Sequence, residues 1–118
     1  MKQYLFVMRR LPHDGSQLQE TLDAILTAAA FDQKVALLFA DDGVWQLKKH
    51  QQPSELALKD SAAIFKALAI YDVNDLYVER ESLQARGLDV DDLILPVVSV
   101  ARREVNRLIA GYDVLIPD

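Results

Sequence analysis

The strongest candidates for chemistry are acidic side chains that follow the second apolar run of the chain. Asp41 and Asp42 come directly after residues 35–40, and Gly43 follows them. Open α/β sheets bind ligands beyond the carboxyl ends of their strands, so this acidic pair could hold a magnesium ion, as in phospho-acceptor domains. Those domains also need an acidic pair after the first strand, where this chain has two arginines. A turn with local aspartate hydrogen bonds is the favoured interpretation.

The two histidines and two of the serines are weaker candidates. A metal ion or a general base would require His13 or His50 to converge with carboxylates. His13 is expected in the loop after the first strand, but no partner lies beside it in sequence, so solvated loop histidines are favoured for both. Ser16 and Ser82 lack the context of a nucleophile elbow and are predicted to cap helices.

Two residue counts exclude further kinds of site. The chain contains no cysteine, which excludes disulfides, thiolate metal sites and sulfur carried on this chain as a persulfide. Its four glycines are too scattered for a dinucleotide fingerprint or a phosphate-binding loop. We therefore expect no metal and no cofactor.

Short apolar runs that alternate with helical segments predict the scaffold for these residues. The runs are residues 5–8, 35–40, 76–78, 95–100 and 114–116, and the helical segments are 16–29, 54–69, 82–86 and 102–110. This order predicts right-handed βαβ units in a single α/β domain over residues 1–118. The expected architecture is a three-layer α/β/α sandwich with a mostly parallel sheet of about five strands. Gly87 and Gly111 are predicted to end helices in the left-handed conformation.

Composition restricts the partners that we expect. The 118 residues are 51% apolar and carry a net charge of −5, so direct binding of RNA by this chain alone is not expected. No apolar run approaches the roughly 20 residues of a membrane span, and the N-terminal apolar stretch is too short for a signal peptide. We expect a soluble, cytoplasmic protein with no membrane contact. Trp45 is interpreted either as a core residue or as an interface anchor, since tryptophan is enriched at interface centres.

Motifs in a fixed order along essentially the whole chain carry a family resemblance. They are residues 11–15, 19–26, 40–47, 65–73, 82–88 and 112–115. The most specific is 40–47, which reads Asp, Gly, Val, aromatic, Gln and Leu from Asp42 onward. Together these motifs resemble the DsrE/DsrF/DsrH-like sulfur-relay family, most closely its TusC (DsrF-like) branch.

The resemblance implies a five-stranded parallel sheet and a heterohexamer with two copies each of B-like, C-like and D-like subunits. It implies that persulfide sulfur passes through this complex for 2-thiolation of the tRNA wobble uridine, with an indirect link to tRNA through partner proteins. The acceptor cysteine belongs to the D-like subunit, and its position here corresponds to Glu79, which cannot carry a persulfide. The resemblance therefore implies a non-catalytic structural subunit. Possible interface or cleft residues are His13, Asp42, Gly43, Trp45 and Gln46.

Three alternatives stay open at this point. The first is a subunit of a related DsrEFH-type complex in sulfur oxidation, which the sequence does not separate from tRNA thiolation. The second is a homo-oligomeric module that binds a small molecule. The third is an enzyme whose His13, Asp14 and Asp41 converge at the strand ends with perturbed pKa values.

Overall fold

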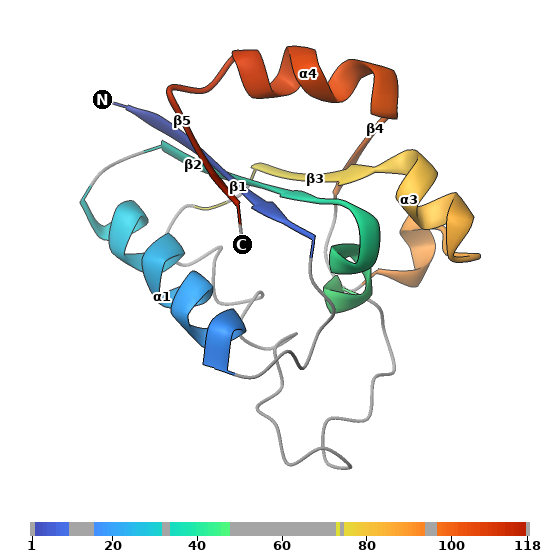
Figure 1. The fold of residues 1–118 in the computed structure, drawn as a ribbon, viewed down its shortest axis with the longest axis horizontal. Helices are drawn as coiled ribbons and strands as arrows, with labels where there is room; N and C mark the ends of the chain where they lie inside the picture. The colour runs from blue at the N-terminus through green and yellow to red at the C-terminus, as the bar shows by residue number, and fades with distance from the viewer. Residues whose placement is uncertain are drawn as a thin grey trace.

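One parallel sheet organises the protein (Figure 1). The computed structural model describes residues 2–9, 16–31, 34–47, 73, 75–93 and 97–117. Within them the strands lie in the order β4-β3-β2-β1-β5, and each neighbouring pair is parallel. Their bounds are β1 Gln3–Met8, β2 Lys34–Phe39, β3 Asp75–Glu79, β4 Val98–Val100 and β5 Val114–Pro117. The predicted five-stranded parallel sheet is confirmed.

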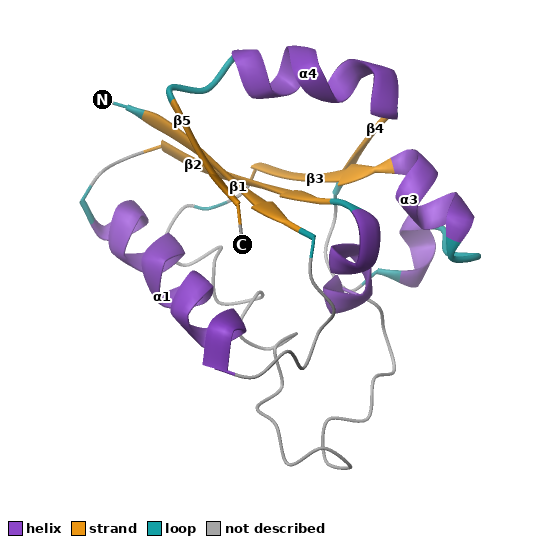
Figure 2. Ribbon diagram, viewed as in Figure 1, coloured by secondary structure: helices purple, strands orange, loops and turns teal. Residues whose placement is uncertain are grey.

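Helices cover both faces of this sheet (Figure 2). They are α1 Ser16–Ala30, α3 Arg80–Ala85 and α4 Arg102–Ala110, with the short 3-10 helices η1 Asp41–Leu47 and η4 Val90–Asp92. α1 and α4 lie on opposite sides of the strands, which confirms the three-layer sandwich. The helix predicted over residues 54–69 lies outside the described residues. No helix in the described part of the chain is long and apolar enough to cross a membrane.

The two faces of the central strands build two separate hydrophobic clusters. Phe6 of β1 packs in the cluster that includes Ile25 of α1 and Leu83 of α3. Its neighbours in sequence point the other way, so Leu5 packs in the cluster that includes Val105 of α4. Because β1 and β2 are covered on both faces, their sequences are apolar without alternation, as predicted for the second apolar run.

Two glycines are required by the backbone where strands end and helices stop. A Cβ at position 43 would lie 1.8 Å from the carbonyl oxygen of Met8, so only glycine lets η1 pack over the end of β1. Gly87 has a φ of +68° and ends α3 in a Schellman motif, with Leu88 N–H donating to the Leu83 carbonyl at 2.9 Å. The left-handed cap predicted for Gly87 is confirmed.

The left-handed cap predicted for Gly111 is wrong. Its φ is −79°, within the right-handed region, and its N–H donates to the Leu108 carbonyl at 3.1 Å. The last turn of α4 therefore continues into the connection to β5 without a change of hand.

Candidate functional site

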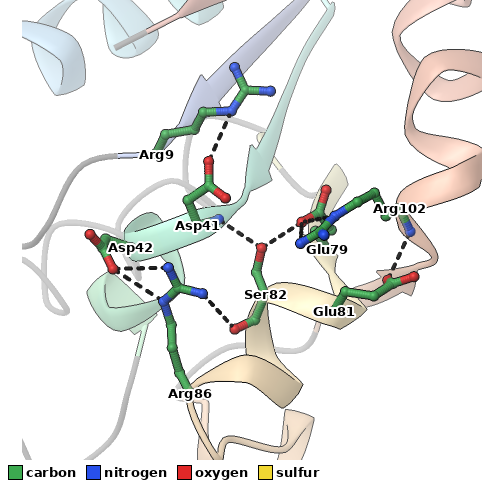
Figure 3. Close-up of polar contacts among 8 residues, drawn as sticks. All are labelled: Arg9, Asp41, Asp42, Glu79, Glu81, Ser82, Arg86 and Arg102. Carbon is green, nitrogen blue, oxygen red and sulfur yellow. Dashed lines mark hydrogen bonds and ion pairs between the residues drawn. The ribbon is translucent and has the colours of Figure 1, made fainter.

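A network of paired charges lies where β2 and β3 end (Figure 3). Asp41 and Asp42 begin η1 directly after β2, and Glu79 is the last residue of β3. Their partners come from α3, from the first turn of α4 and, for the Asp41 side chain, from Arg9, which follows β1. This is the edge of the sheet at which parallel α/β folds place ligand sites, so it is the first place to look for chemistry.

Glu79 is the buried centre of this network. Glu79 is 7% exposed, and its Oε1 accepts hydrogen bonds from Ser82 Oγ at 2.6 Å and from Arg102 Nη2 at 3.0 Å. Arg102 Nε donates to the same oxygen at 3.2 Å. A buried carboxylate is tolerated when it is paired and hydrogen-bonded in this way. Glu79 is buried although residues 79–81 are all charged, because α3 begins at the very next residue and the first residue of α4 reaches over it.

Ser82 links Glu79 to the segment that follows β2. The serine is fully buried, and its hydroxyl accepts a hydrogen bond from the Asp41 backbone N–H at 2.8 Å while it donates to Glu79. The prediction that Ser82 caps a helix is wrong: it is the third residue of α3, and Glu79 holds the N-cap position. The serine instead joins η1, β3 and α3 through one oxygen atom.

Arg86 fixes the second aspartate of the candidate acidic pair. Its Nε and Nη2 donate to Asp42 Oδ1 at 3.2 and 3.0 Å, and its Nη1 donates to the Ser82 carbonyl at 3.1 Å. The first aspartate, Asp41, faces Arg9 Nε at 3.6 Å, with both side chains about half exposed. Among the described residues there is no group of three or more side chains that could hold a metal ion. Arginines of this chain pair with both aspartates of the acidic pair.

Glu81 attaches the start of α4 to the same corner. Its Oε1 accepts a hydrogen bond from the Arg102 backbone N–H at 2.8 Å, and this bond lowers the pKa of Glu81 below its usual value. The hydrogen bond to Glu79 raises the pKa of the Arg102 side chain. One residue, Arg102, is thus held twice, through its backbone by Glu81 and through its guanidinium by Glu79. These contacts fix where α4 begins relative to β3.

The remaining candidate residues divide into those that the structure describes and those that it does not. Trp45 is partly buried in η1, beside the fully buried Val44 and Gly43. Its exposed part is compatible with an interface anchor. His13, Asp14 and the side chain of Gln46 lie outside the described residues, so the enzyme hypothesis built on His13, Asp14 and Asp41 stays a prediction.

The contacts of this network hold elements of the fold together. Among the described side chains of this network, Ser82 is the hydroxyl that contacts a carboxylate, but it is fully buried and both accepts and donates a hydrogen bond. Sequence reasoning missed the contacts of Ser82 and Arg102 with Glu79. The available signal was a glutamate that ends an apolar strand three residues before a serine, a spacing that places both side chains on one side of a following helix.

Comparison with known proteins identifies the family and agrees with the fold. The model of the DsrE/DsrF-like family matches residues 2–117. A protein named TusC homolog from Pseudomonas aeruginosa is 39% identical over 95% of this chain and 94% of its own length. The protein named intracellular sulfur oxidation protein DsrF from Allochromatium vinosum is 39% identical over 80% of this chain and 69% of its own length. The crystal structure of the ychN protein from E. coli superposes on this chain with a TM-score of 0.84 at 17% identity, and the superposition covers both chains completely.

The fold and the site together define a class of protein, a three-layer α/β/α domain whose strand-end charges are paired with one another. Within that class the match over residues 2–117 and the relatives at 39% identity are decisive. The chain belongs to the DsrE/DsrF-like family.

Proposed function

We propose that this chain is a non-catalytic structural subunit of a heteromeric sulfur-relay complex, which passes persulfide sulfur for 2-thiolation of the tRNA wobble uridine. The observation that carries the proposal is Glu79, a buried carboxylate at the end of β3 that is bonded to Ser82 and Arg102, in a chain without cysteine. The relatives named TusC homolog, which align with nearly the whole chain, support the assignment to this relay.

Glu79 occupies the position at which, by family resemblance, the D-like partner subunit carries its acceptor cysteine. A persulfide forms on a thiolate sulfur, and a carboxylate offers no equivalent atom. The Glu79 side chain instead holds α3, η1 and α4 in place through Ser82 and Arg102. In this chain the position therefore carries a structural group, as expected of a scaffold subunit.

The proposed complex contains two copies of this chain together with B-like and D-like subunits, and it reaches tRNA indirectly through partner proteins. A net charge of −5 disfavours contact with bare RNA and is compatible with protein partners. The partly exposed Trp45 in η1 supplies one anchor for such a contact. The cytoplasm, where tRNA is modified, is the proposed location.

A related complex that acts in sulfur oxidation is the second candidate function. The relative named intracellular sulfur oxidation protein DsrF favours it, because that protein is as similar in identity as the TusC homologs. The structural role of this chain would be the same in both complexes, and the partners would differ.

Isolation of the tagged chain from its native cells, followed by native mass spectrometry, tests the proposal. We expect two further small subunits in equal amounts, one of which carries a thiol that reacts with an alkylating reagent. Recovery of the chain alone, or with further copies of itself and nothing else, would contradict the proposal.

A further inference from the structure

In the described part of the chain, α4 leaves aliphatic side chains exposed on the sheet face that it covers. α4 has nine residues, so it is about 14 Å long, whereas five strands span about 19 Å from edge to edge. Val98 on one edge strand is 58% exposed, and Leu115 on the other is 47% exposed. Val98 pairs with Tyr77 and Leu115 pairs with Leu5, and both of those partners pack in the cluster of α4. The two exposed aliphatic side chains therefore lie on the same face of the sheet as α4.

Positive charge concentrates on the outer side of α4. The helix contains Arg102, Arg103 and Arg107 but a single acidic residue, Glu104, in a chain whose net charge is −5. Arg103 and Arg107 are exposed and four residues apart, so they share one side of the helix. Within the described ranges neither is within ion-pair distance of a carboxylate, whereas Arg102 is held by Glu79.

We propose that Arg103, Arg107, Val98 and Leu115, here called the α4 face, bind an acidic protein surface on a companion subunit. This inference rests on the proposed relay complex and names one of its interfaces. Arg103 and Arg107 outnumber the acidic Glu104 on α4 and so determine the sign of the occupant's charge, and electrostatic complementarity steers such contacts. Arginine is enriched at protein interfaces, whereas nucleic-acid contacts depend on basic groups along a phosphate backbone.

The network at the strand ends supports this surface indirectly. Arg102 is the first residue of α4, and its bonds to Glu79 and Glu81 fix the start of the helix to the β3–α3 corner. A helix fixed at its start presents Arg103 and Arg107 in one orientation before a partner arrives. Less conformational freedom is then lost on binding.

The test uses two variants of this chain, each with two charges reversed. Calorimetry measures how tightly each variant binds the purified companion subunits, at low and at moderate salt. Arg103→Glu with Arg107→Glu is the test variant, and Lys34→Glu with Arg80→Glu is the matched control with the same change in net charge at two other exposed basic residues. We expect the test variant to bind at least about tenfold more weakly and to lose much of the salt dependence, and the control to stay within about threefold of wild type. Circular dichroism and unfolding curves of each variant establish that it is folded.

A second pair of variants tests the apolar part of the α4 face. Leu115→Ser is expected to weaken binding several-fold, and Val90→Ser, at an exposed valine in η4, is expected to leave it unchanged.

Each outcome has one meaning. Equal loss in the test variant and the control, or no loss in either, overturns the α4 face while leaving the relay complex intact. Wild-type chain that binds no companion overturns the proposed function and this inference together. If the test variant keeps its companions but loses self-association or retention of tRNA, the face belongs to a second copy or to RNA, and the inference is wrong.

Discussion

Replacing Ser82 by alanine removes the oxygen atom that joins three elements at the strand ends. The hydroxyl donates to the buried Glu79 carboxylate at 2.6 Å and accepts from the Asp41 N–H at 2.8 Å. A hydrogen bond to a charged group contributes about 1.5–3 kcal/mol, and alanine returns about 0.5 kcal/mol through its higher helix propensity. We expect the free energy of unfolding to fall by about 2 kcal/mol.

Urea unfolding of the purified chain, followed by circular dichroism, measures this change directly. A loss of about 2 kcal/mol corresponds to a Tm lower by about 8 °C for a domain of this size. Ser99→Ala is the matched control, because Ser99 is exposed in β4 and the same atom is removed there. We expect the control to change the free energy of unfolding by less than about 0.5 kcal/mol.

A double-mutant cycle with Glu79→Gln then assigns the loss to the Ser82–Glu79 contact. The two substitutions should be non-additive, since both remove the charged hydrogen bond between the same two side chains. If Ser82→Ala is as mild as Ser99→Ala, or if the two losses simply add, the network does not stabilise this corner and the structural role of Glu79 is refuted.

Three further predictions concern the backbone and the titrating groups. Gly43→Ala should destabilise the fold by about 3 kcal/mol or more, because its Cβ would overlap the Met8 carbonyl. Gly111→Ala should be neutral or slightly stabilising, since its Cβ has a nearest contact of 3.4 Å and its φ is −79°. Urea unfolding measures the free energy of unfolding of both variants. The lowered pKa of Glu81 adds stability that is present above its unfolded value of 4.5 and is lost as pH falls through the folded value, so Glu81→Gln should flatten the acid limb of the stability–pH curve below about pH 4.5. Burial first, and then the Tyr77 hydroxyl, raise the pKa of Tyr112 above 10.0, so stability should fall as pH rises beyond 10, and Tyr112→Phe should reduce that alkaline loss. An unchanged acid or alkaline limb would contradict the corresponding assignment.

Much of the fold follows from patterns that are local in the sequence. Residues 35–40 are apolar without alternation because β2 is central in the sheet and covered on both faces, so the sequence carries the signal for a buried parallel strand. Gly87 follows a short helical segment and ends α3 as predicted. Gly111 follows α4 in the same way but stays right-handed, because a glycine permits the left-handed conformation without requiring it.

The site was harder to predict because its contacts join residues that are far apart in the chain. Ser82 looked like a helix cap from its neighbours, yet its partners are Glu79 and the backbone of Asp41. Arg102 lies 23 residues from Glu79, and no local sequence pattern predicts that contact. The family resemblance directed attention to Glu79, but the structure was needed to show that its carboxylate is buried and bonded.

Sulfur transfer by the assembled complex tests the central claim most directly. Labelled sulfur would be supplied to the companion subunits with and without this chain, and the label on each subunit and on the tRNA would be measured. The account predicts that transfer to the tRNA requires this chain while the chain itself never carries label. Equal transfer in its absence, or label bound covalently to this chain, would contradict the account.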